Sequence, residues 1–162
     1  MLILNIYVKP YLAEYARRRY ASAMPDVAQF SACSLVNHAI VNSLAEPPVE
    51  SKERHGNLLV MVNEKYCGLK DIEKYNYLTF DGENKVGKML LLDFDMFLHS
   101  YMDRARYRNG IDYQDSARAF VEKYHLGGLV TEEALLKKHV RWKKQIKKYR
   151  TEAVQLKLKV ES

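Results

Sequence analysis

KVGKMLLLDFDMFLHSYMDRARYRNG, residues 85–110, carries a sustained apolar repeat. The repeat has the three-to-four-residue spacing of a helix and consists of Val86, Leu90, Phe94, Phe97, Leu98 and Tyr101. Neighbouring apolar residues widen the stripe, and a helix that is apolar over so much of its surface belongs at the centre of a fold. Gly110 is typical of a helix C-terminus. The pattern therefore predicts a central helix over 85–108.

Two apolar runs rich in β-forming residues predict strands at 2–8 (LILNIYV) and 57–65 (NLLVMVNEK). We expect them to share one sheet, with the segments 27–30 and 154–160 as candidates to extend it. The last segment alternates apolar and polar residues as a half-buried strand does. The residues around Leu156 also continue a helical stripe, so both a strand and a helical tail are consistent with this segment.

Helical periodicity predicts further helices over 10–23 and 32–45, and a C-terminal helical hairpin over 113–150. Together these elements predict an α+β fold, in which helices cover a small sheet. We expect a core domain over residues 1–110. Residues 111–162 would form the hairpin and a tail, packed on the core as one compact unit.

The composition is that of an ordinary folded domain. The chain has 162 residues, 48% of them hydrophobic, with few prolines and glycines. Cys33 and Cys67 are expected to be reduced, buried thiols, and the first ten residues do not have the pattern of a signal peptide, so we expect a cytoplasmic protein. No stretch approaches the roughly 20 apolar residues of a membrane span. The polar residues of 49–56 predict a mobile loop.

Positive charge is concentrated in TEEALLKKHVRWKKQIKKYR, residues 131–150. Eight Lys and Arg side chains oppose Glu132 and Glu133, giving a local charge of +6, which equals the net charge of the whole chain. On a helix, one face carries the apolar stripe Leu135, His139, Trp142, Ile146 and Tyr149, and the opposite face carries the ridge Lys137, Arg141, Lys144 and Lys148. One face can pack on a core while the other meets an anion.

The ridge predicts binding to nucleic acid, with DNA as the leading candidate, in a sequence-tolerant or regulatory role. A helix, a glycine-containing turn and a capped basic helix have the outline of a helix-turn-helix, although HLGGLV is longer than the usual turn, so a looser helical hairpin is an alternative. Lys137, Lys144 and Lys148 are expected to neutralise phosphates. Arg141 has the planar fork that suits guanine, and Gln145 suits adenine.

Two features weigh on this prediction. Lysine-rich faces of amphipathic helices are often only solvated surfaces, but here no acidic residue lies between Glu133 and Glu152 to balance the lysines. A binding partner would compensate for that charge. RNA is an alternative to DNA, and an adaptor whose basic helix contacts an acidic protein surface is an alternative function. We also expect a homodimer, and we expect Trp142 to pack in the core rather than stack on a base.

Evidence for catalysis is weak. Asp95 and His99 have the i, i+4 spacing that lets two side chains share a metal, but Asp93 lies too far around the helix to join them, and a solvated face explains the pair better. The five histidines form no HExxH motif, and the chain has no phosphate-binding glycine loop and no nucleophile elbow. We therefore expect no metal, no cofactor and no enzymatic activity, with an enzyme of unrecognised type as the third alternative.

Residues 120–150, FVEKYHLGGLVTEEALLKKHVRWKKQIKKYR, resemble the C-terminal parts of small basic proteins, mostly uncharacterised, of bacterial mobile elements and prophages. The resemblance covers about a fifth of the chain and includes no catalytic motif. It implies a setting, the DNA of a mobile element, and no activity.

Overall fold

The computed structural model describes residues 1–49, 55–62 and 71–161. It has a three-stranded sheet, a two-stranded sheet and five helices along the described chain, which confirms the predicted α+β fold. The larger sheet has the order β1-β4-β2 and consists of β1 (Leu2–Ile6), β2 (Val27–Gln29) and β4 (Leu58–Val62). As predicted, the first and last of these strands share a sheet: they are antiparallel, with Leu4 opposite Val60, and β2 joins β4 in parallel.

The helices follow the predicted order. They are α1 (Pro10–Arg19), α2 (Leu35–Ser43), α3 (Phe80–Asn109), α4 (Tyr113–Lys123) and α5 (Glu132–Glu161). The small sheet pairs β3 (Leu44–Ala45) with β5 (Tyr77–Leu78). α3 begins at Phe80 rather than at residue 85, because the Thr79 side chain caps it by accepting a hydrogen bond from the Gly82 amide at 3.1 Å. It ends where predicted, at Gly110 with a left-handed φ of 66°.

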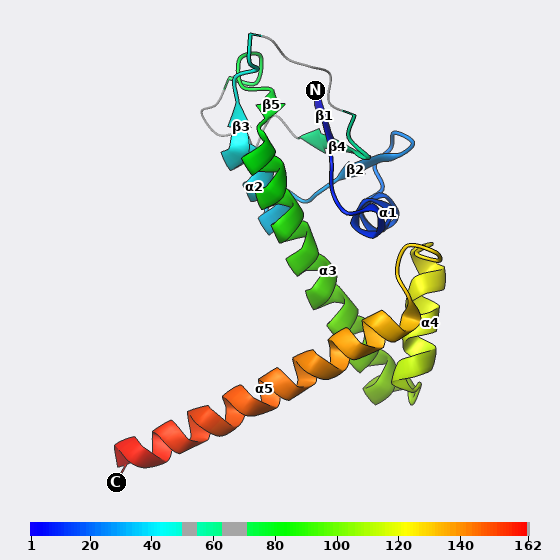
Figure 1. The fold of residues 1–162 in the computed structure, drawn as a ribbon, viewed down its shortest axis with the longest axis vertical. Helices are drawn as coiled ribbons and strands as arrows, with labels where there is room; N and C mark the ends of the chain where they lie inside the picture. Colours follow the sequence, from blue (N-terminus) through cyan, green and yellow to red (C-terminus); the bar gives the residue numbers. More distant parts are fainter. Residues whose placement is uncertain (50–54, 63–70, 162) are drawn as a thin grey trace.

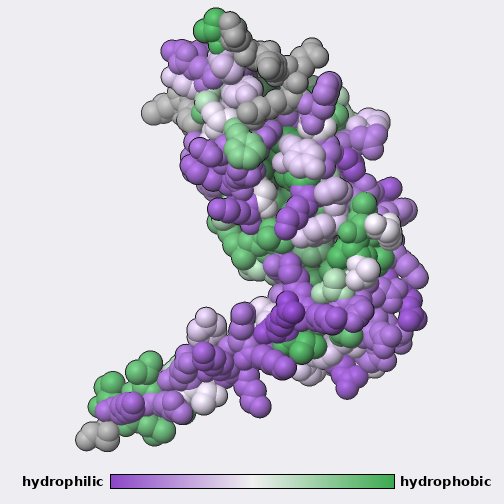
Figure 2. Space-filling view, in the orientation of Figure 1, coloured by the Kyte–Doolittle hydropathy of each residue, from purple (hydrophilic) through white to green (hydrophobic). Residues whose placement is uncertain are grey.

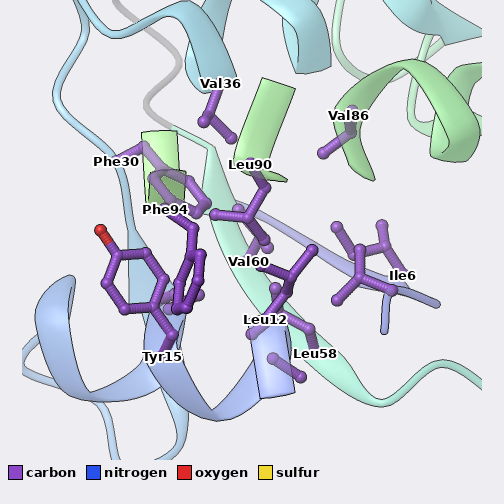
Figure 3. Packing of buried hydrophobic residues seen from close by; sticks show 14 of the residues in the cluster. Ile6, Leu12, Tyr15, Phe30, Val36, Leu58, Val60, Val86, Leu90 and Phe94 are labelled. Atoms are coloured by element: carbon purple, nitrogen blue, oxygen red, sulfur yellow. The ribbon is translucent and has the colours of Figure 1, made fainter. Parts of the chain in front are cut away.

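The hydrophobic core is built around α3, as the apolar repeat predicts. Leu90 and Phe94 of this helix pack with side chains of α1 and of the strands, and Figure 3 shows the cluster. Tyr15 of α1 is fully buried, and its ring lies 5.0 Å from that of Phe94 in an edge-to-face arrangement. Phe120 of α4 packs against both rings, with its centre 5.7 Å from that of Phe94 and 6.5 Å from that of Tyr15. The C-terminal hairpin therefore shares the core of the sheet and its helices.

α5 leaves the body of the molecule after its first turns and extends away from it (Figure 1). The helix continues without a break to Glu161, so the strand interpretation of 154–160 is wrong and the helical alternative is right. The reason is geometric: this segment lies far from both sheets of the described chain, so neither sheet offers it a strand edge to pair with. The division of the chain near residue 110 stays a prediction.

Several other expectations concern single features. Cys33 is exposed, so its predicted burial is wrong; Cys67 and most of the loop 49–56 lie outside the described residues. Within the described ranges, no helix is both long enough and apolar enough to cross a membrane.

Candidate nucleic-acid interface

The basic helix α5 consists of two parts with different surroundings. Residues 132–146, the inner half, pack on α3 and α4 through Leu135, which is 2% exposed, and the fully buried His139. Residues 147–161 form the outer half, in which every residue from Lys147 to Val160 is exposed. Figures 1 and 2 show this half standing clear of the body. The two halves therefore present the same basic sequence pattern in different environments.

Acidic side chains of α3 hold the inner half. The Asp103 carboxylate lies 2.7 Å from Nζ of Lys143 and accepts a hydrogen bond from the Tyr113 hydroxyl at 3.2 Å. Asp95, two turns earlier on α3, forms an ion pair with Lys138. Two lysines of the basic stretch are thus neutralised by a neighbouring helix. For these two, the expectation that the lysines lack acidic partners is wrong, because the partners come from a distant part of the sequence.

A pair of buried histidines joins α3 to α5. His99 and His139 lie with their Nδ1 atoms 3.0 Å apart, so one ring donates a proton and the other accepts it. Nε2 of His139 is 3.2 Å from the Asp103 carboxylate, but its direction does not satisfy hydrogen-bond geometry, so this contact is chiefly electrostatic. Trp142 stacks on His99 with ring centres 4.4 Å apart and planes inclined by 13°. Trp142 is half-buried and packs on His99, but it is not part of the hydrophobic core, so its predicted place in the core is wrong.

Burial keeps both imidazoles neutral near pH 7. It lowers the pKa of His99 to about 4, and the nearby charges of His139 and Lys138 act in the same direction. Burial also lowers the pKa of His139, although Asp103 opposes this effect. The neutral pair is compatible with the donor-acceptor contact between the rings. Asp95 pairs with Lys138, and His99 contacts His139, so each has a partner within the protein. No group of three or more potential metal ligands occurs in the described part of the chain.

The predicted contact residues are all on the surface: Lys137, Arg141, Lys144, Gln145 and Lys148. Lys137 is paired with Glu133 at 2.7 Å, and Lys148 lies 3.8 Å from Glu152. Arg141 and Lys144 form no ion pair with any residue that the structure describes, and the same is true of Lys147 and Arg150. Within α5, unpaired positive charge therefore lies mainly between residues 141 and 150.

An open groove of about 570 Å³ separates α3 from α5. Arg141 and Gln145 line it together with Lys138 and Trp142, whereas Lys137, Lys144 and Lys148 do not. The two side chains expected to contact bases thus lie beside each other, apart from the three expected to contact phosphates. The α3 side of the groove includes the exposed apolar residues Leu92 and Met96. Sequence reasoning missed this groove, because it depends on how two separate helices cross.

Comparisons of the chain with protein-family models, with curated proteins and with solved structures find no match.

Proposed function

We propose that the protein binds DNA through the exposed basic ridge of α5. The observation that carries the proposal is the run of exposed cations from Arg141 to Arg150, which begins in the inner half of α5 and reaches the outer half, where no element of the described chain covers the helix. At 1.5 Å per residue, a 30-residue helix is about 45 Å long. The B-DNA major groove, about 12 Å wide, admits one α-helix. A helix that projects from the body of the protein can enter that groove.

The charge distribution supports this proposal. Arg141, Lys144, Lys147 and Arg150 lack acidic partners in the described structure, so their charges are available to phosphates. Each cation that replaces a condensed counterion on duplex DNA contributes to affinity and to its salt dependence. In this proposal Lys144 and Lys148 contact phosphates. Arg141 and Gln145, which line the protein groove between α3 and α5, contact base edges.

The proposed binding mode is a projecting helical hairpin rather than a compact helix-turn-helix. Residues 124–131 connect α4 to α5, and the connection contains two left-handed residues, His125 with φ of 54° and Gly128 with φ of 79°. This connection is longer than the three-to-four-residue turn of that motif. Specificity for particular bases would then rest on few side chains, so we expect affinity that varies little with sequence.

The test is binding of a fluorescent 20-base-pair duplex, measured by anisotropy at several salt concentrations. Arg141→Gln, Lys144→Gln and Lys148→Gln are combined in one variant. Because each lost phosphate contact removes about 0.9 from the slope of log affinity against log salt, we expect weaker binding and a visibly flatter slope.

A matched variant controls for net charge. Lys9→Gln, Lys85→Gln and Lys88→Gln remove the same charge from exposed positions outside α5. We expect this second triple variant to bind DNA almost as the unaltered protein does. Equal loss in the two variants, or no binding of the unaltered protein to duplex at low salt, contradicts the proposal. Tighter binding to an RNA of the same sequence would replace DNA by RNA as the ligand.

A further inference from the structure

The outer half of α5 exposes large apolar side chains at its free end. Leu156 is 64% exposed and Val160 is 86% exposed, and Tyr149 is exposed nearer the body. Figure 2 shows apolar side chains gathered at this end of the helix, beyond the hydrophilic middle. Apolar side chains that gather at one place on a surface commonly mark an interaction site.

These side chains continue the stripe that the inner half buries. Along the whole helix the spacing alternates regularly between four and three residues, through Leu135, His139, Trp142, Ile146, Tyr149, Ala153, Leu156 and Val160. This is the a/d repeat of a coiled coil, in which each such residue packs against a facing helix. For Leu135 and His139 the facing elements are α3 and α4 of the same chain. For Tyr149 and the residues after it, no described part of the chain supplies one.

The charges beside the exposed stripe select the partner. Arg150 and Lys157 occupy the same flanking position in successive heptads, and neither has an ion-pair partner in the described chain. Flanking positions set the choice of partner in coiled coils through charge. A partner helix with an apolar face would cover the exposed stripe, and carboxylates beside that face would form ion pairs with Arg150 and Lys157.

A second copy of this chain fits less well. In antiparallel pairing, flanking residues of one kind face each other, which brings Arg150 against Lys157 of the other copy on one edge and Glu152 against Lys159 on the other, so the favourable edge is offset by an unfavourable one. In parallel pairing, Glu152 could meet Lys157, but the second helix would continue toward the inner half, where α3 and α4 already cover the stripe. An acidic helix from a different protein avoids the repulsion between Arg150 and Lys157 and can end before the inner half.

We propose that the outer half of α5 docks an amphipathic helix of another protein, with the apolar stripe Tyr149, Ala153, Leu156 and Val160 as its seat and acidic residues facing Arg150 and Lys157. The stripe and the ridge from Lys137 to Lys148 lie on different faces of the helix. Docking therefore does not require DNA. Arg150 belongs to both surfaces, so DNA and the docked helix would compete there, and the peptide is tested without nucleic acid to keep the outcome independent of the proposed function.

The probe is a synthetic three-heptad peptide with Ile at a, Leu at d and Glu at both flanking positions, labelled and titrated with the full chain in the absence of nucleic acid. We expect saturable binding. Leu156→Ser should weaken it about tenfold or more, because a central apolar residue of the seat is lost. The same peptide with Lys at the flanking positions should not bind.

Leu158 provides a matched control. It is two residues from Leu156, is 62% exposed and lies on a different face of the helix, so Leu158→Ser makes the same chemical change outside the stripe. We expect Leu158→Ser to change affinity by less than about twofold. Equal weakening by the two variants, or no binding of the acidic peptide at millimolar concentration, overturns the proposal. Sedimentation that reveals a homodimer, which Leu156→Ser dissociates, overturns it in favour of a second copy.

Discussion

The inner and outer halves of α5 share one sequence pattern and differ in what surrounds them. In the inner half, the stripe residues Leu135 and His139 are buried against the neighbouring helices. Two lysines of this half are neutralised by Asp95 and Asp103. In the outer half, the stripe is exposed and Arg150 has no acidic partner in the described structure. Periodicity thus determines which face is apolar, whereas the neighbouring elements determine whether that face and its charges are satisfied.

This difference separates two roles of a basic amphipathic helix: attachment to the core of its own chain and binding of another molecule. In the inner half, Lys138 and Lys143 contribute to attachment because they pair with α3, whereas Arg141 and Lys144 have no acidic partner in the described structure. The charges of the outer half are available to another molecule. Net charge alone does not distinguish the two cases, and the comparison between the halves leads to three predictions about the isolated protein.

The largest expected effect comes from truncating the stripe in each half. Leu135→Ala removes a side chain that is 2% exposed and should lower the free energy of unfolding by about 2–5 kcal/mol. Leu156→Ala removes an exposed side chain and should change it by less than about 0.5 kcal/mol. Chemical denaturation of both variants measures the contrast. Similar losses would mean that the outer stripe is buried in solution.

Acidic pH should act on the inner half through its histidine pair. The pKa of His99 is about 4 in the folded protein and 6.5 in the unfolded chain. Between these two pH values the unfolded chain binds a proton at His99 and the folded protein does not. The folded state therefore loses stability as pH falls from 6.5 to about 4. A difference of that size corresponds to about 3 kcal/mol. The measurement is the free energy of unfolding across this pH range.

A substitution at His99 tests whether this residue causes the pH dependence of stability. His99→Asn keeps a donor near Nδ1 of His139 but has no titrating group, so its stability should vary less between pH 6.5 and 4. The lowered pKa of His139 leaves a smaller dependence of the same sign. An unchanged pH profile in His99→Asn would place the titrating group elsewhere.

The sequence was sufficient to predict the parts of the fold that depend on local periodicity. The repeat from Val86 to Tyr101 predicts α3, and the apolar runs predict the pairing of β1 with β4. The last residues were ambiguous because Leu156 and Val160 belong both to an alternating pattern and to a helical stripe. The segment is helical because it lies far from the strands that the structure describes, and that distance depends on the arrangement of the other elements.

The surroundings of the candidate site could not be predicted in the same way. Its five residues are on the surface, but the ion pairs of Lys138 and Lys143 join positions about 40 residues apart in sequence. No local pattern records such contacts. The buried contact of His99 with His139 has the same character, since each histidine alone is only one polar residue within an apolar stripe. Binding to DNA stays a prediction.

The smallest expected effect tests whether the two halves unfold together. Lys137 and Lys148 are both exposed, and each lies near a glutamate one helical turn away. Lys137→Gly weakens a helix that is part of the core and should lower the free energy of global unfolding by about 1 kcal/mol. Lys148→Gly should leave that value unchanged, because the outer half can unwind while the core stays folded. Its effect should instead be faster amide hydrogen exchange after residue 148. An equal loss of global stability in both variants would show that the outer half unfolds together with the core, and that its exposed stripe is covered in solution.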